Sequence, residues 1–138
     1  MQGFPVIVPI PVRYRDLDTF NHVNNAVFLT YFEVARVAYF RELARVYPGD
    51  RFRPVVVRAE VDYKRSIRLE DEVRVGVRVA RVGGTSFVMA YRVEASGHLA
   101  AEGKTVHAWL GEDWRPARIP EPIRARIRDF ETLPVEGL

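Results

Sequence analysis

Polar and apolar residues follow a helical pattern in the first third of the chain. No side chain is charged from Asn24 to Phe32, and charges return only at Glu33 and Arg36. A segment that is apolar on every side belongs inside a protein, and this one is too short to span a membrane. The expected best-packed face comprises Phe28, Phe32, Ala35, Tyr39, Leu43 and Val46. The pattern predicts a buried helix that Asn24 caps, that ends before Pro48-Gly49, and that reaches solvent only in its second half.

Alternating apolar and polar positions predict five strands. The first covers residues 6–14, where three prolines on the opposite parity favour an edge strand with a frayed start. The other four follow Pro54 and cover residues 55–66, 71–82, 85–95 and 98–110. Gly83-Gly84 and Ser96-Gly97 mark tight turns. Such short connections predict antiparallel pairing of these strands.

The tail contains a second, shorter helical pattern. Pro120 and Pro122 precede a basic segment in which Ile123, Ile127 and Phe130 share one face. We interpret this segment as a helix that caps the subunit. Contact of the helix with nucleic acid or a membrane is the weaker alternative.

Together these elements predict an α+β fold in a single domain over residues 1–138. An antiparallel sheet of about five strands would wrap around one long central helix, with a short helix at the C-terminus. One helix covers only one face of a sheet. The other face is therefore expected to be partly apolar and to be covered in an oligomer.

Composition narrows the possible chemistry. The chain of 138 residues contains no Cys, which excludes disulfides, a Cys nucleophile and thiolate metal sites. Its three His residues lack ligand spacing, so no metal site is expected. The formal charge is only +3 and comes mostly from Arg, which suits phosphate contacts but also ordinary surface ion pairs. No apolar run could cross a bilayer and the N-terminus lacks signal-peptide features, so a cytoplasmic location without membrane contact is expected.

The polar turn before the long helix is the candidate site. First-turn N–H groups of a helix are unpaired and carry a partial positive charge, so they can bind an oxyanion. Asp18 lies just upstream of this helix start. A carboxylate beside such N–H groups suits attack on an acyl group, because the N–H groups polarise the carbonyl. The alternative is that the Asp18 side chain merely caps the turn.

The segment RYRDLDTFNHVNNAVFLTYFEVAR, residues 13–36, resembles the opening motif of hotdog-fold acyl-CoA thioesterases of the 4-hydroxybenzoyl-CoA thioesterase type. The branch that it resembles is written D-x-D-x-x-G-H-V-N-N-x-x-Y, followed by E-x-A-R. The likeness extends over the later strands and the tail. It implies the hotdog fold, and dimers with sites at the subunit interface that often pair into tetramers. One departure is Asn21, which stands where the family has Gly; Asn tolerates positive φ better than other residues with a side chain.

The resemblance also implies roles for individual residues. Asp18 would be the catalytic carboxylate, and the backbone N–H of Asn25 would be the oxyanion donor. His22 would orient the loop or contact the thioester. Residues implied in binding the acyl group or coenzyme A are Asn24, Phe28, Tyr63, Lys64, Arg65, Thr85 and Ser86.

Other polar residues of the motif have structural interpretations. Asp16 is expected to hold the turn or a neighbouring Arg, and Glu33 and Arg36 are spaced to form a helix ion pair. His98 and His107 lie on the last predicted strand and are expected to be structural.

We therefore predict an acyl-CoA thioesterase that hydrolyses a fatty or aromatic acyl-CoA to a carboxylic acid and free coenzyme A, acting as a homodimer or homotetramer. No cofactor is expected, since coenzyme A is part of the substrate. The sequence leaves open whether Asp18 acts as nucleophile or as general base. One alternative is a non-catalytic acyl-CoA-binding or regulatory hotdog protein, which would need no carboxylate at this position. The other is a nucleic-acid-binding module, against which the modest charge and the lack of aromatics among the basic clusters count.

Overall fold

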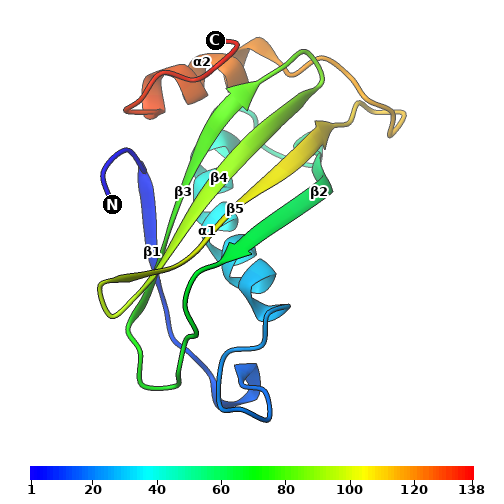
Figure 1. Cartoon of the computed structure of the whole chain (residues 1–138). Coiled ribbons are helices and arrows are strands. Elements are labelled where there is room, and N and C mark those ends of the chain that lie inside the picture. The colour runs from blue at the N-terminus through cyan, green and yellow to red at the C-terminus, as the bar shows by residue number, and fades with distance from the viewer.

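The computed structural model describes residues 1–138 as one sheet and two α-helices (Figure 1). The strands are β1 (Val6–Ile10), β2 (Pro54–Tyr63), β3 (Val73–Val82), β4 (Ser86–Ala95) and β5 (His98–Trp109). The helices are α1 (Val27–Ala44) and α2 (Glu121–Phe130), and a 3-10 turn, η1, covers Tyr14–Asp16. All strand pairs are antiparallel, in the order β1-β3-β4-β5-β2. α1 lies against one face of this sheet, so the predicted α+β hotdog fold is confirmed.

Neither helix is both long and apolar enough to cross a membrane.

The inner face of α1 forms the centre of the core. Residues at most 1% exposed on this face are Phe28, Phe32, Ala35, Tyr39 and Leu43, as their spacing predicted. Phe32 stacks on Tyr91 of β4 with ring centroids 4.3 Å apart, which joins the helix to the middle of the sheet. Val46 was expected on the same face but is 41% exposed, because the helix ends at Ala44.

The uncharged sequence predicted that the first half of α1 is buried on every side. The structure shows that one side of it is exposed. Leu29 is 41% exposed and Val34 is 47% exposed, while Val37 of the second half is exposed as expected. The sheet covers only one side of the helix, so the apolar residues on the other side stay at the subunit surface. Residues 55–57 of β2, all Val, are exposed too, and Leu29 and Val56 line one groove between α1 and β2. An exposed apolar surface therefore follows this edge of the sheet.

The two edge strands differ from the sequence expectation in one respect each. β1 ends at Ile10 rather than at residue 14, because Pro11 has no N–H to donate and the chain then turns into η1. β2 pairs with β5 rather than with its chain neighbour β3, and no strand pairs with its other edge. The free backbone groups along this edge of a ten-residue strand are available for pairing with another chain.

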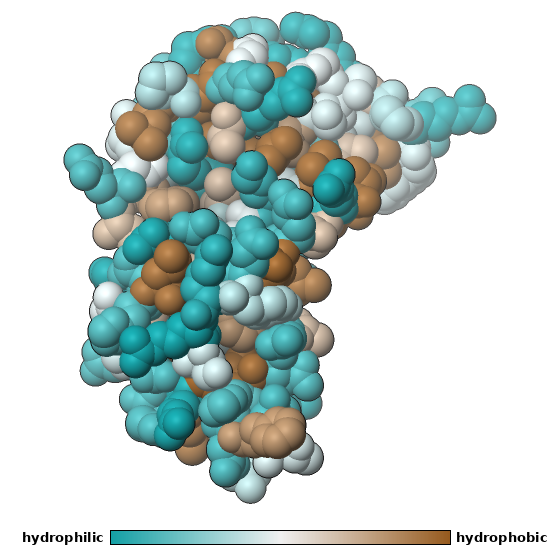
Figure 2. Space-filling view, viewed as in Figure 1, coloured by the Kyte–Doolittle hydropathy of each residue, from teal (hydrophilic) through white to brown (hydrophobic).

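The face of the sheet turned away from α1 combines charged and apolar residues (Figure 2). Two grooves on it are lined by charged residues that include Arg58, Glu60, Arg92, Glu102 and Lys104. Ala80, Val88 and Val106 line one of these grooves together with the charged residues. The outer face is therefore partly apolar, as expected, and a further exposed apolar surface lies along β2 and α1.

α2 packs across one end of the sheet (Figure 1). Ile123 and Ile127 are at most 1% exposed, as expected for the inner face of a capping helix. The Arg124 guanidinium donates to the backbone carbonyls of Gly83, Gly84 and Ile119, which ties α2 to the β3–β4 turn. At the end of the helix, Glu131 accepts hydrogen bonds from the Tyr39 hydroxyl at 2.6 Å and from the Val79 N–H at 2.8 Å.

The close approach of α1 to β5 depends on Gly103. A Cβ at this position would lie 2.6 Å from Cζ of Phe32 and 2.7 Å from the carbonyl oxygen of Glu60. We expect Gly103→Ala to lower the free energy of unfolding by about 1–3 kcal/mol in urea titrations, because the core must shift to admit the methyl group. Gly84→Ala is the matched control, since a Cβ there meets nothing within 4 Å, and should change stability by less than about 0.5 kcal/mol. Equal effects of the two substitutions would contradict the packing argument.

Candidate active site

The loop between η1 and α1 has a fixed backbone. Asp18 N–H donates to the carbonyl of His22 at 2.8 Å, and Val23 N–H donates to the carbonyl of Ile67 at 2.8 Å. Asn21 has a φ of 60°, the left-handed conformation that Asn tolerates better than other residues with a side chain. The loop therefore makes a tight turn at Asn21 that is closed by backbone hydrogen bonds.

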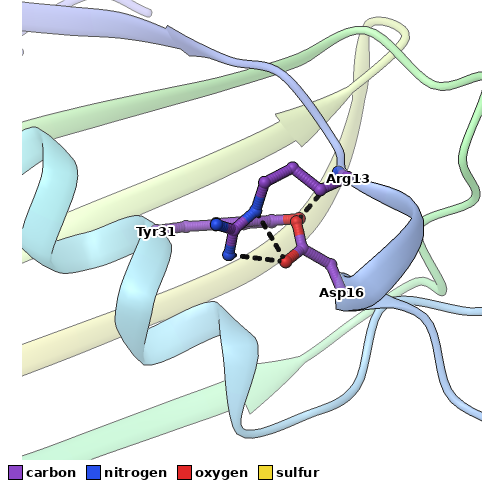
Figure 3. A network of polar contacts seen from close by, with 3 residues as sticks. All are labelled: Arg13, Asp16 and Tyr31. Atoms are coloured by element: carbon purple, nitrogen blue, oxygen red, sulfur yellow. Dashed lines mark hydrogen bonds and ion pairs between the residues drawn. The ribbon is translucent and has the colours of Figure 1, made fainter.

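Asp16 anchors this loop to α1 (Figure 3). Its carboxylate accepts two hydrogen bonds from the Arg13 guanidinium, at 2.9 and 3.1 Å, and one from the Arg13 N–H at 3.0 Å. The Tyr31 hydroxyl donates a fourth at 2.9 Å. Burial acts to raise the pKa of Asp16, but the bonds from Arg13 and Tyr31 outweigh it and hold the pKa below its usual value. Asp16 thus has the structural role expected of it, and both of its oxygens are occupied.

The contribution of Tyr31 was not predicted. The residue is 2% exposed. Burial, and to a smaller extent the neighbouring Asp16 carboxylate, raise the pKa of its hydroxyl. The only sequence signal was a polar atom in an otherwise apolar stretch of helix, which does not reveal a partner on a different element.

Asp18 differs from Asp16 in that one of its oxygens is free. Oδ1 accepts hydrogen bonds from the N–H groups of Phe20 at 2.8 Å and His22 at 3.2 Å, so the side chain does cap its turn. Oδ2 has no hydrogen-bond partner in the chain. The residue lines a cleft of about 300 Å³. The turn role and a chemical role are therefore compatible, since each uses a different oxygen.

Asn25 has an unpaired N–H and lines the same cleft as Asp18. α1 begins at Val27 with Ala26 as its N-cap, so Asn24 is not the N-cap that was expected but belongs to the turn in front of the helix. The Asn24 side chain still has a capping role, because its Oδ1 accepts the Ala26 N–H at 2.9 Å. The N–H of Asn25 donates to no group in the chain, while its carbonyl accepts the Tyr63 hydroxyl at 2.7 Å. The expected oxyanion donor is thus unpaired and lies in the same cleft as Asp18.

Most of the predicted site residues line that cleft together. The lining residues are Asp18, His22, Val23, Asn25, Phe28, Tyr63, Lys64, Arg65 and Ser66. The Phe28 and Tyr63 rings meet edge to face at 5.1 Å and form its apolar part. Lys64 and Arg65 add two cations next to Asp18. Ser66 was not predicted; its only sequence signal is its place directly after the two basic residues.

Three predicted binding residues lie elsewhere. The Asn24 side chain faces the helix start, as described. Thr85 and Ser86 lie at the opposite end of the sheet, where Ser86 pairs with Ala108, whereas Tyr63 at the cleft pairs with Ala101. A single subunit therefore does not bring Thr85 and Ser86 to the cleft.

The remaining polar groups do not form a second reactive centre. His107 is fully buried, and its Nε2 lies 2.7 Å from the Thr105 hydroxyl. Burial and then the charge of Arg36 lower the pKa of His107 to about 3, so the ring is neutral at physiological pH. Glu33 and Arg36 form the expected ion pair at 3.7 Å. No group of three or more His, Asp or Glu residues is arranged to hold a metal ion.

The arrangement suits reaction at an electrophilic carbonyl. A carboxylate oxygen without a partner can attack a carbonyl carbon or take a proton from water. An unpaired N–H at a helix start can bind the oxygen on which negative charge develops. Lys64 and Arg65 can bind an anionic part of the same ligand.

Comparisons with known proteins agree with this chemistry. The family model described as the thioesterase-like superfamily matches residues 12–127. The crystal structure of a thioesterase from Thermus thermophilus, complexed with coenzyme A and Zn, superposes with a TM-score of 0.90 at 50% identity, over 98% of this chain and 100% of that one. A DHNA-CoA thioesterase from Staphylococcus aureus superposes with a TM-score of 0.78 at 26% identity, over 90% of this chain and 88% of that one. The Bacillus subtilis protein YsmA is 32% identical over 89 residues, which are 64% of this chain and only 60% of the length of that relative.

The Asp16 anchor predicts a pH-dependent stability. A carboxylate whose folded pKa lies below its unfolded value of about 3.9 stabilises the fold above that pH, and the contribution is lost as the pH falls through the folded pKa. We expect Asp16→Asn to cost about 1–3 kcal/mol at pH 7, because the amide turns a donor toward Arg13 and Tyr31. In urea titrations the difference from wild type should shrink below about pH 4. Asp129→Asn, at an exposed position on α2, is the control; a pH-independent deficit in Asp16→Asn would contradict the role of the charge.

Proposed function

The chain belongs to the thioesterase-like superfamily, and from this premise we propose that it hydrolyses acyl-CoA thioesters to a carboxylic acid and free coenzyme A. The observation that carries the proposal is the pairing, in one cleft, of the free Oδ2 of Asp18 with the unpaired N–H of Asn25. The Thermus thermophilus neighbour with bound coenzyme A supports the nature of the carrier. The Staphylococcus aureus neighbour acts on a CoA thioester, which supports the class of reaction.

The proposed reaction uses each of these groups once. The substrate carbonyl oxygen accepts the Asn25 N–H, which polarises the carbon and stabilises the oxyanion. Asp18 Oδ2 either takes a proton from a water whose oxygen bonds to the carbonyl carbon, or bonds to that carbon itself. Collapse of the oxyanion breaks the C–S bond, and the leaving thiolate takes the proton that Asp18 removed from water or, in the nucleophilic form, a proton from solvent. In the nucleophilic form a mixed anhydride remains, which water then hydrolyses to restore Asp18.

The supporting residues define how a substrate would lie. The hydroxyl of Tyr63 holds the Asn25 carbonyl and so fixes the orientation of the residue that carries the oxyanion donor. Phe28 and Tyr63 offer an apolar contact for a fatty or aromatic acyl group. Lys64 and Arg65 would contact the pantetheine or phosphate part of coenzyme A. The D-x-D and His-Val-Asn-Asn motif favours the 4-hydroxybenzoyl-CoA thioesterase type among the members of the superfamily.

A homodimer fits the exposed features of the subunit. The unpaired edge of β2 and the exposed apolar residues of β2 and α1 lie next to each other. We propose that two copies pair through β2, and that dimers associate further through the charged outer face.

A non-catalytic acyl-CoA-binding protein is the second candidate. It would use the same cleft and the same cations. The free Asp18 oxygen favours the enzyme, because a binding protein gains nothing from an unpaired carboxylate beside a thioester.

The decisive variant is Asp18→Asn. Its amide oxygen can still accept the N–H groups of Phe20 and His22, so the turn survives while the free carboxylate oxygen is lost. We expect thiol release from short, medium, long and aromatic acyl-CoAs to fall at least about a hundredfold, roughly 2.7 kcal/mol of barrier. The protein contains no Cys, so it adds no background to a thiol reagent. Asp129→Asn again serves as control. Wild-type protein that binds an acyl-CoA but releases no thiol from any of them would favour the binding protein instead.

The dimer has its own test. We expect Val57→Lys, at a residue 61% exposed on the free edge, to convert the dimer to a monomer near 15.9 kDa in sedimentation analysis, because a Lys opposes pairing along an edge strand. Val88→Lys on the outer face is the matched control and should keep the β2-paired dimer. A dimer that Val88→Lys disrupts and Val57→Lys leaves intact would contradict pairing through β2.

A further inference from the structure

Trp114 is held outward in a strained conformation. It is 65% exposed and has a φ of 60°, which is rare for a bulky residue. Two hydrogen bonds close the turn that carries it. The N–H of Trp114 donates to the Gly111 carbonyl at 3.0 Å, and the N–H of Gly111 donates to the Arg115 carbonyl at 2.9 Å. A fixed turn that presents an indole to solvent offers a ready surface for stacking.

Arg53 covers one face of this indole. Its guanidinium lies 4.3 Å from the ring centroid and is held by bonds to the carbonyls of Asp50 and Gly111, both at 2.8 Å. Arg51, two residues before Arg53 in the chain, lies 4.4 Å from the centroid of Tyr47. Neither guanidinium has an ion-pair partner in the chain. We call the group of Trp114, Arg53 and Arg51 the Trp114 platform: one flat aromatic surface with two uncompensated cations.

The platform lies at the end of the sheet away from the cleft. Arg53 precedes Pro54, which pairs with Trp109, and Ser86 lies at this same end. Tyr63, Lys64 and Arg65 lie at the other end of β2. Antiparallel pairing of two β2 strands about their middle sets the start of one strand opposite the end of the other, about 4.8 Å away. In such a dimer the partner's Trp114 platform would lie beside the Tyr63–Arg65 rim of the cleft, together with the partner's Thr85 and the partner's Ser86.

We propose that the Trp114 platform of one subunit binds the nucleotide of the acyl-CoA whose thioester is hydrolysed in the cleft of the other. This rests on the proposed function and on the β2-paired dimer. The adenine would stack on the face of the indole that Arg53 leaves open, since a purine offers a flat surface of matching size. The phosphates would meet Arg53 and Arg51, because guanidinium groups pair well with phosphate oxygens. The split placement of the predicted coenzyme A residues then has a physical reason: the two ends of the ligand are held by two subunits.

The first test compares substrates with and without the nucleotide. We expect Trp114→Ala to raise KM for an acyl-CoA about tenfold with kcat unchanged, because base stacking on an aromatic side chain is lost. The same acyl group on pantetheine, which lacks the nucleotide, should show the wild-type kcat/KM in this variant. Trp114→Phe, which keeps a ring, should restore most of the affinity for acyl-CoA. A deficit that is equal for the two substrates would mean that Trp114 only supports the fold or the interface, and would overturn the proposal.

The second test asks which subunit supplies the platform. Asp18→Asn subunits and Trp114→Ala subunits are mixed to form heterodimers. One site of each heterodimer joins an intact Asp18 to the partner's intact Trp114, so action across the interface predicts activity with the wild-type KM. If Trp114 served the cleft of its own subunit, every site with an intact Asp18 would lack the indole and KM would stay raised.

A direct binding measurement separates this proposal from the proposed function. Titration of free coenzyme A into the catalytically inactive Asp18→Asn protein needs no turnover. The double variant, which carries Trp114→Ala as well as Asp18→Asn, should bind coenzyme A about tenfold more weakly than Asp18→Asn alone. This expectation holds whether or not the wild type hydrolyses any acyl-CoA tested. Unchanged affinity would overturn the platform even if the thioesterase activity is found.

Discussion

The packing of α1 on one face of a single sheet fixes the positions of the other features. Phe32 lies over Gly103 and stacks on Tyr91, so helix and sheet meet without space for a side chain on β5. Because the helix is fixed at this point, the distance between the start of α1 and the end of β2 is fixed too. The Tyr63 hydroxyl can therefore reach the carbonyl of Asn25, a residue that lines the cleft and has an unpaired N–H. Core packing and the geometry of the candidate site thus depend on the same contact.

Asp16 and Asp18 lie two residues apart, but their hydrogen-bond partners give the first a structural role and leave the second free for a chemical one. Asp16 accepts four hydrogen bonds from Arg13 and Tyr31, and has no capacity left for a ligand. Asp18 uses one oxygen for its turn and keeps the other free at the cleft. The first acid stabilises the loop that presents the second. A reactive group on a loop must be held by such contacts, because a loop alone does not fix its geometry to the accuracy that catalysis requires.

The sequence predicted the features that depend on local patterns. The buried face of α1 and the four later strands follow from periodicity, and the structure has them; Asn21 adopts the positive φ that Asn tolerates. The features it missed depend on contacts between distant segments. Tyr31 finds Asp16 only after α1 folds back on η1, and Leu29 is exposed because the sheet wraps one side of the helix and not the other. Thr85 follows a recognisable turn, yet no local signal shows that β4 carries it to the far end of the sheet from Asp18.

Three unsatisfied features of the subunit meet at one edge. β2 has unpaired backbone groups along one side, apolar residues beside it are exposed, and the predicted coenzyme A residues are divided between its two ends. Each feature alone permits several explanations, such as an edge protected by charge or an apolar patch for an unrelated partner. A two-fold pairing of β2 with its copy accounts for all three, because antiparallel pairing fills the edge, covers the apolar residues and brings opposite ends of two strands together. Burial of apolar surface would then stabilise the assembly in which the binding site is complete, so that a separated subunit would have the cleft without the residues that hold the far end of the ligand.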